Sequence, residues 1–152
     1  MDKKDEEILQ ILKKNAKIGV QRISSITNMP ITTVHNRIKR LEKNGIIKNY
    51  SINIDYAKIG KKISALILAK LDHKVLRESG LNLEEIIKRV LKVPGIQRIF
   101  TVTGSIDLVL RIRADNIIEL DNILTKSLMN LEFISDTETM IVIHDIKETD
   151  SV

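Results

Sequence analysis

The chain has 152 residues, a net charge of +5 and no cysteine. This length fits one ordinary domain or two small ones, and the absence of cysteine excludes disulfides and thiol chemistry. The sequence also lacks an apolar run of about 18 residues, which a transmembrane helix needs, and its charged start lacks the apolar core of a signal peptide. We therefore expect a cytoplasmic protein without a membrane partner.

The positive charge is concentrated in the first third of the sequence. Residues 1–50 hold 11 Lys and Arg against 5 Asp and Glu, whereas residues 51–152 hold 14 against 15. A basic N-terminal segment followed by a nearly neutral remainder is typical of a protein that binds a polyanion through one domain. A lipid surface is an alternative polyanion, but short helices punctuated by glycine do not favour one long interfacial helix.

Two short helices are expected before residue 30. Asp2, supported by Asp5, can cap the first of them. The second helix is predicted over Val20–Thr27, and the turn Asn28–Pro30 leads into a third helix. Three short helices, with a tight turn between the last two, form a helix-turn-helix domain.

The segment Ile31–Gly45 has the pattern of the recognition helix. Val34, Ile38 and Leu41 are spaced by four and three residues and so line one helical face. Gly45 stands where helices commonly end. The other faces carry hydroxyl, amide and cationic groups, which can contact base edges and phosphates of double-stranded DNA. The candidate DNA-binding residues are Arg22, Thr32, Thr33, His35, Asn36, Arg37, Lys39, Arg40 and Lys43.

This interpretation has simpler alternatives at two levels. The whole segment could be an ordinary surface helix with a solvated cationic face. Arg37 could brace the domain internally instead of contacting a phosphate, and Arg22 could be a solvated surface side chain. The helix-turn-helix context and the localised positive charge favour DNA binding.

The remainder of the chain alternates strand and helix patterns. A strand is predicted over Ile46–Ile54, followed by a polar connection. The further expected elements are strands at 63–71, 96–103, 106–113 and 135–146, helices at 83–91 and 117–128, and a turn-rich connection at 73–82. This order is the split βαβ, or ferredoxin-like βαββαβ, arrangement, an antiparallel sheet with both helices on one face. The fold class is α+β.

The second face of this sheet would be bare in a monomer. The apolar residues expected on it are Leu66, Leu68, Ile99, Val109, Ile141 and Ile143. Such a face is too apolar to leave in water, so we expect two sheets to pack together in a dimer. The predicted domains are a helix-turn-helix domain at 1–46, a linker strand and connection at 47–62, a ferredoxin-like domain at 63–147 and a tail at 148–152.

The sequence resembles the Lrp/AsnC family, the leucine-responsive and asparagine-responsive transcription regulators. The segments that carry the resemblance are Asp5–Lys17, Thr32–Asp55, Val93–Ile112 and Thr137–Lys147. It implies a DNA-binding dimer with linker strands paired across subunits, and assembly into tetramers, octamers or larger rings. Met29-Pro30 departs from the family pattern, in which a hydroxyl residue opens the third helix, so Thr32 or Thr33 would supply any capping hydroxyl.

The resemblance also implies an amino-acid effector bound between dimers by the ferredoxin-like domain. The matching positions are Thr103, Gly104, Ser105, Asp107, Phe133, Ile134 and Ser135. Gly104 permits close approach of a ligand, turn amides can receive a carboxylate, and Asp107 can receive an α-ammonium group. Alternatively, Gly104 simply makes a hairpin turn and Asp107 decorates a strand end. No other cofactor and no metal is expected.

Three further classes of function were weighed against a regulator. An enzyme is disfavoured because His35, His73 and His144 are isolated and no phosphate-binding glycine loop, HExxH or nucleophile elbow occurs. A helix-turn-helix that binds only protein would not need the localised charge. A chromatin-like architectural protein without an effector stays open; it would bind DNA with little sequence preference.

Overall fold

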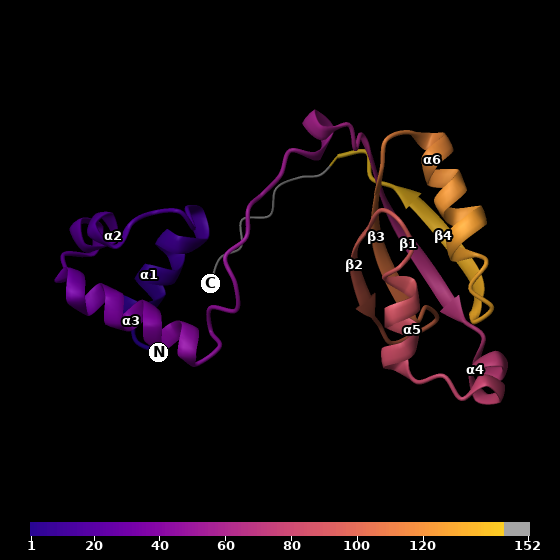
Figure 1. The fold of residues 1–152 in the computed structure, drawn as a ribbon, viewed down its shortest axis with the longest axis horizontal. Helices are drawn as coiled ribbons and strands as arrows, with labels where there is room; N and C mark the ends of the chain where they lie inside the picture. Colours follow the sequence, from indigo (N-terminus) through magenta and orange to yellow (C-terminus); the bar gives the residue numbers. More distant parts are fainter. Residues whose placement is uncertain (145–152) are drawn as a thin grey trace. The chain divides into compact units, whose positions relative to one another are not determined.

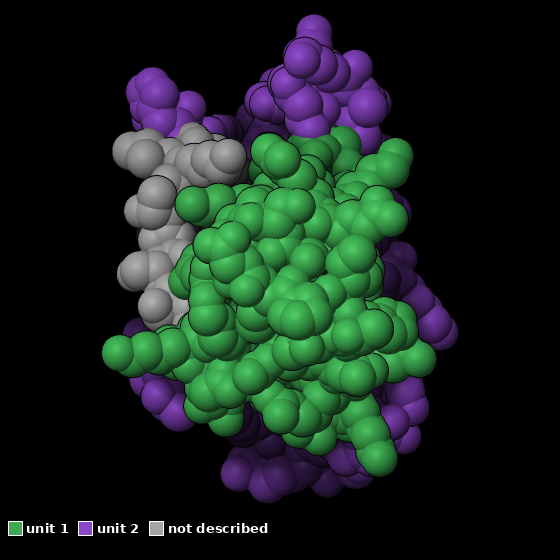
Figure 2. All heavy atoms as spheres, turned by 90° about the vertical axis from the view of Figure 1, so that its left-hand side faces the viewer, with its two compact units in different colours: residues 1–54, 148–152 green, residues 55–147 purple. Residues whose placement is uncertain are grey.

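The structure, a computed structural model, describes residues 1–144 and divides into two compact units (Figure 1). The first unit comprises residues 1–54 and is drawn in green in Figure 2; the second begins at Asp55. Between residues 1 and 144, no helix is long and apolar enough to cross a membrane. The same residues contain no cluster of metal-ligating side chains. The expected tail at 148–152 lies outside the described residues.

Three helices build the first unit. They are α1 (Lys3–Lys14), α2 (Val20–Thr27) and α3 (Ile31–Lys43). The capping box expected at the start of α1 is confirmed, because the Asp5 amide donates to Asp2 Oδ1 and the Asp2 amide donates to Asp5 Oδ2. One apolar side from each helix meets in a common core of Ile8, Leu12, Ile23, Val34 and Leu41.

The turn between α2 and α3 is the tight turn that a helix-turn-helix needs. Asn28 adopts the left-handed conformation with φ of 52°, and its amide donates to the Ser24 carbonyl. Pro30 occupies the N-cap position of α3, and no side chain caps this helix. Neither Thr32 nor Thr33 therefore caps the helix, and both hydroxyls remain available for other partners.

The strand predicted over Ile46–Ile54 does not form in the single chain. A strand requires a hydrogen-bonded neighbour, and no other segment among residues 1–144 pairs with this one. Within one chain the prediction fails, because an apolar alternation indicates a preference for extended backbone but does not supply the partner. Ile52 remains 84% exposed.

The second unit is the expected antiparallel sheet with helices. Its elements are η1 (Tyr56–Ile59), β1 (Ile63–Leu71), α4 (His73–Ser79), α5 (Leu83–Val90), β2 (Ile96–Thr101), β3 (Leu108–Ala114), α6 (Ile117–Asn122), η2 (Ile123–Leu128) and β4 (Ile134–Ile141). The strands lie in the order β2-β3-β1-β4, and every neighbouring pair is antiparallel. This confirms the ferredoxin-like prediction.

Several local details differ from the prediction. β2 ends at Thr101 and not at residue 103, and β3 begins at Leu108 and not at residue 106. The connection after β1 contains the short helix α4, capped by Asp72, which accepts from the amides of Lys74 and Val75. The expected helix over 117–128 changes from α to π geometry at Ile123. The predicted final strand ends at Ile141 in the structure, and residues 145 and 146 lie outside the described part.

One face of the sheet is covered by α5, α6 and η2. Figure 1 shows these helices on one side of the sheet. Alternate residues of β1 and β3, such as Ala65, Ile67 and Leu110, pack with helix residues in a single core. The register of the strands shows that two residues expected on the bare face lie on the covered one. Ile99 is paired with Leu110, and Ile141 with Ala65, so both belong to the covered face. The apolar residues of the uncovered face are Leu66, Leu68, Phe100, Val109 and Met140.

Ile143 was also expected on the bare face, but it lies beyond the end of β4. Its side chain is 85% exposed, so it belongs to neither packed surface of the sheet. The uncovered face is therefore defined by β1, β2, β3 and β4 alone.

Candidate nucleic-acid interface and ligand site

The solvent side of α3 carries a continuous polar stripe. The stripe comprises Thr32, His35, Asn36, Lys39 and Lys43, all of which are exposed. Spacings of three and four residues put these five on one side of the helix, opposite the buried Val34 and Leu41. The stripe contains hydrogen-bonding groups and two cations but no carboxylate. It can therefore approach both base edges and phosphates in the major groove.

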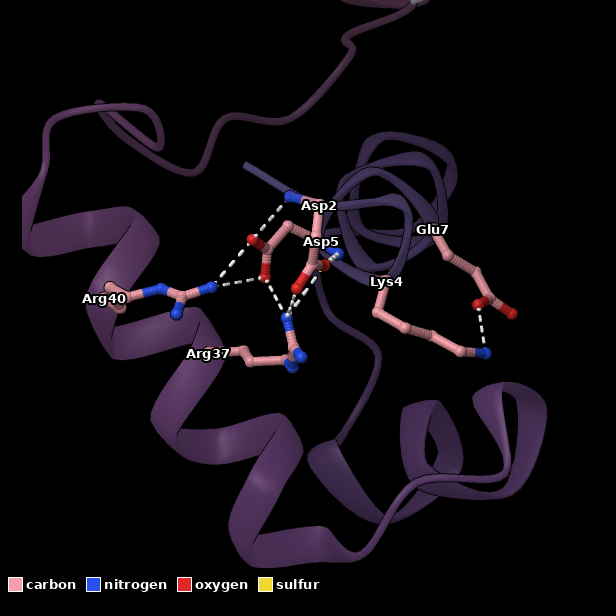
Figure 3. A network of polar contacts seen from close by, with 6 residues as sticks. All are labelled: Asp2, Lys4, Asp5, Glu7, Arg37 and Arg40. Atoms are coloured by element: carbon pink, nitrogen blue, oxygen red, sulfur yellow. Dashed lines mark hydrogen bonds and ion pairs between the residues drawn. The ribbon is translucent and has the colours of Figure 1, made fainter.

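Arg37 and Arg40 lie on a different side of α3 and contact the start of α1 (Figure 3). Nη1 of Arg37 donates to Asp2 Oδ2 and to Asp5 Oδ1, each at 2.7 Å. Nη2 of Arg40 donates to Asp5 Oδ1 at 2.9 Å and to Asp5 Oδ2 at 2.7 Å. The two arginines thus share the carboxylate of Asp5. The contacts of Arg37 are those of the internal brace that the sequence left open as an alternative to a phosphate contact.

Asp5 is the central acceptor of this network and is unusually buried for a carboxylate. Its side chain is 2% exposed, against 23% for Arg37 and 54% for Arg40. Burial alone would raise the pKa of Asp5, but the hydrogen bonds from Arg37 and the Asp2 amide and the charge of Arg40 outweigh it and lower this pKa. The hydrogen bonds from Arg37 likewise lower the pKa of Asp2. The carboxylates are therefore fully ionised at neutral pH.

The two remaining candidates have simpler surroundings. Thr33 is half-buried on the flank of α3, and Arg22 is exposed on α2.

Near the end of α3, the hydroxyl of Tyr50 donates to Glu42 Oε1 at 2.7 Å. Burial and this carboxylate raise the pKa of Tyr50 to about 12. This contact could not be predicted from the sequence, because the strand pattern over Ile46–Ile54 gives Tyr50 no partner on α3.

The two segments of the expected effector site meet at the end of β1. Oδ2 of Asp107 accepts from the Leu71 amide at 2.8 Å, and Leu71 is paired with Ile134 on the other side. The hydroxyl of Ser135 donates to the Lys70 carbonyl at 3.2 Å. Asp107 and the start of β4 therefore flank the last residues of one strand.

The turn after β2 offers free donors beside Asp107. The Thr103, Gly104 and Ser105 amides donate to no carbonyl or side chain among residues 1–144, and Gly104 has a φ of 123°. Oδ1 of Asp107 accepts no hydrogen bond from residues 1–144, and Nε2 of His73 lies 3.8 Å from it. His73 was not among the expected effector residues. Its only signal was its position directly after β1.

Phe133 differs from the other expected effector residues. Its side chain is 1% exposed and belongs to the core of the second unit, while its carbonyl accepts from the Asp72 amide. Ile134 also packs against that core. Only the backbone of this segment and the exposed Ser135 are open to a ligand in a single chain.

A helix-turn-helix with a basic recognition helix, joined to a ferredoxin-like sheet domain, defines a DNA-binding protein with a separate ligand or assembly domain. Residues 1–48 match the winged helix-turn-helix DNA-binding family, and residues 64–152 match the Lrp/AsnC ligand binding domain. The chain belongs to the Lrp/AsnC family. It is a DNA-binding transcription regulator and not an enzyme.

Relatives and solved structures agree with this assignment. HTH-type transcriptional regulator FL11 of Pyrococcus furiosus is 35% identical over 98% of this chain and 93% of its own length. The L-Met complex of transcriptional regulator NMB0573 from Neisseria meningitidis has the same fold, with a TM-score of 0.89, 24% identity and coverage of 100% and 96% of the two chains. The feast or famine regulatory protein of M. tuberculosis, complexed with L-methionine, gives a TM-score of 0.85, 16% identity and coverage of 99% and 97%.

Proposed function

We propose that the chain is a sequence-specific regulator whose action on DNA is modulated by an amino acid bound beside Asp107. The observation that carries the proposal is the pairing of one open carboxylate oxygen with a turn of free amides. An amino acid presents an ammonium and a carboxylate group a few ångströms apart, which complements this arrangement. Two proteins of the same fold bind L-methionine, which supports this class of ligand.

The roles on the DNA side follow from the exposed stripe of α3. Thr32, His35 and Asn36 would contact base edges, together with Lys39. Lys43 and Arg22 would contact the phosphate backbone and set the orientation of the domain. Because the target is chromosomal DNA, the proposed place of action is the cytoplasm.

Self-association completes the proposal. The uncovered face carries apolar side chains such as Phe100, which is 45% exposed, and Met140, which is 41% exposed. A second copy packed on this face would remove them from water and would bring two recognition helices to one DNA molecule. Larger assemblies would place the turn at Thr103–Ser105 between dimers. The domains would then be 1–46 for DNA and 63–147 for ligand and assembly, with 47–62 as linker.

The test is a thermal-shift screen of the full chain against the twenty amino acids. A ligand that binds only the folded protein raises its melting temperature as its concentration rises. Asp107→Asn should abolish the shift, because Asn still accepts from the Leu71 amide but lacks the charge that receives an ammonium group. Asp136→Asn is the matched control. Asp136 lies on β4, its side chain is 66% exposed, and among the described residues Lys70 is its one ion-pair partner.

The outcomes separate the two candidate functions. A shift that survives in Asp107→Asn would contradict the proposed site. If no amino acid shifts the wild-type protein, the effector part of the proposal fails and the architectural DNA-binding protein becomes the better account. DNA binding itself is unaffected by either result, because it rests on the helix-turn-helix domain.

A further inference from the structure

We infer that Asp5, a residue of α1 outside the DNA-facing surface, is a positioning residue for DNA recognition by α3. It is the acceptor that Arg37 and Arg40 have in common, and it lies 32 and 35 residues from them in the sequence. Through these bonds the first turn of α1 is joined to two successive turns of the recognition helix (Figure 3). This inference rests on DNA binding by α3 and does not involve the amino-acid site.

The geometry gives the two arginines different roles. The three hydrogen bonds from Arg37 to carboxylates all leave a single atom, Nη1, and the side chain is largely buried. Arg37 therefore fixes α1 against α3. Arg40 uses only Nη2 for Asp5 and is 54% exposed, so its other guanidinium donors point to solvent. Asp5 therefore binds Arg40 through Nη2, and the other N–H groups of the planar guanidinium remain able to donate to DNA.

Preorganisation explains why such a brace matters for recognition. A free arginine on a helix surface loses several rotamers when it binds, and this entropy loss weakens the contact. The two bonds from Arg40 to Asp5 fix that side chain before DNA arrives. A base contact depends on direction more than a phosphate contact does, so the loss of the brace should reduce discrimination between sequences more than overall affinity.

The charge of Asp5 makes the two explanations predict opposite changes in DNA affinity. Asp5 is a negative charge on a domain that binds a polyanion, so a residue with no positioning role would oppose binding. Its replacement by a neutral residue would then strengthen binding to every DNA sequence. Positioning predicts the opposite for a preferred sequence. Glu7 is the matched control, because it lies on the same helix and its carboxylate pairs with Lys4 alone within residues 1–144.

The experiment uses the full chain and a duplex selected from a random pool, with a scrambled duplex of equal length as reference. For Asp5→Asn, we expect affinity for the selected duplex to fall about tenfold while affinity for the scrambled duplex is unchanged or higher. Glu7→Gln should strengthen both slightly and equally. The ratio of the two affinities is independent of the fraction of folded protein, so lost stability alone does not change it.

Two further variants connect the effect to Arg40. In an Arg40→Gln background, Asp5→Asn should change the affinity ratio far less than it does in the wild type, because the group that Asp5 positions is gone. Asp5→Glu, which keeps the charge, should restore part of the ratio. The inference is overturned if Asp5→Asn behaves like Glu7→Gln, or if its effect is undiminished without Arg40. A failure of sequence-specific binding itself would appear earlier, as equal wild-type affinity for both duplexes.

Discussion

Nη1 of Arg37 lies 2.7 Å from Oδ1 of Asp5, so a cation of the recognition helix is already neutralised inside the domain. A count of positive residues on α3 therefore overstates the charge that faces DNA. The cations of the exposed stripe are Lys39 and Lys43, and Arg40 contributes only the part of its guanidinium that Asp5 leaves open. This difference between paired and unpaired cations can be measured in solution.

The salt dependence of binding should distinguish the two kinds of cation. Lys43→Gln removes a phosphate contact and should reduce the slope of log K against log salt by about 0.9. Arg37→Gln should leave the slope unchanged, because Arg37 releases no counterion from DNA. Fluorescence anisotropy with a labelled duplex over a series of KCl concentrations measures both. An equal reduction in the two variants would show that Arg37 leaves its carboxylates and binds DNA.

Acid should destabilise the first unit through the same network. The pKa of Asp5 lies below its ordinary value of 3.8 in the folded protein, so protons bind the unfolded state more readily. The stabilisation is complete well above pH 3.8 and is lost as the pH falls through this value toward the lower folded pKa. The melting temperature followed by circular dichroism should show this loss. Asp5→Asn should flatten the dependence, and a dependence identical to wild type would contradict the role of Asp5.

Gly95 should be the most sensitive glycine of the second unit. Its φ is 77°, and a Cβ there would clash with the carbonyl oxygen of Arg113, a backbone atom of β3. Gly80 is the matched control, because its φ is 67° and a Cβ would meet nothing within 4 Å. We expect Gly80→Ala to cost about 1 kcal/mol of unfolding free energy and Gly95→Ala about 3 kcal/mol or more. Urea denaturation measures both, and equal losses would refute the clash.

The uncovered sheet face should control the oligomeric state. Phe100→Asp places a charge within the proposed dimer interface, on the edge strand β2, and burial of this charge without a partner is unfavourable. Light scattering should therefore report a mass near that of a monomer, with the circular dichroism spectrum unchanged. Ile118→Asp is the control, since Ile118 is 70% exposed on α6. A Phe100→Asp protein with the wild-type mass would show that the dimer uses another surface.

Local sequence patterns predicted the elements that depend on neighbours in the chain. The bounds of α2 and β1 and the capping box of α1 agree with the structure, because each follows from residues within one or two turns. The short helix α4 was missed because it has no fully buried residue and hence no apolar period. Ile99 was assigned to the wrong face because the register shifts between Ile96 and Arg98.

The site depends more on contacts between distant segments. The exposed stripe of α3 could be predicted, because helical spacing separates it from the buried face. The pairing of Arg37 and Arg40 with Asp5 could not be predicted, because helical periodicity does not indicate which flank of α3 faces α1. The same holds for the bond between Asp107 and the Leu71 amide, which brings two turns together at the end of β1.

The most direct measurement of base recognition by α3 compares Asn36→Ala with Lys43→Gln on the selected and scrambled duplexes. Asn36 lies on the exposed stripe and carries an amide that can pair with a base edge, whereas Lys43 is assigned to a phosphate. We predict that Asn36→Ala weakens binding to the selected duplex by about tenfold and hardly changes binding to the scrambled one. Lys43→Gln should weaken both equally. Equal losses on both duplexes for Asn36→Ala would contradict base recognition by this face of α3.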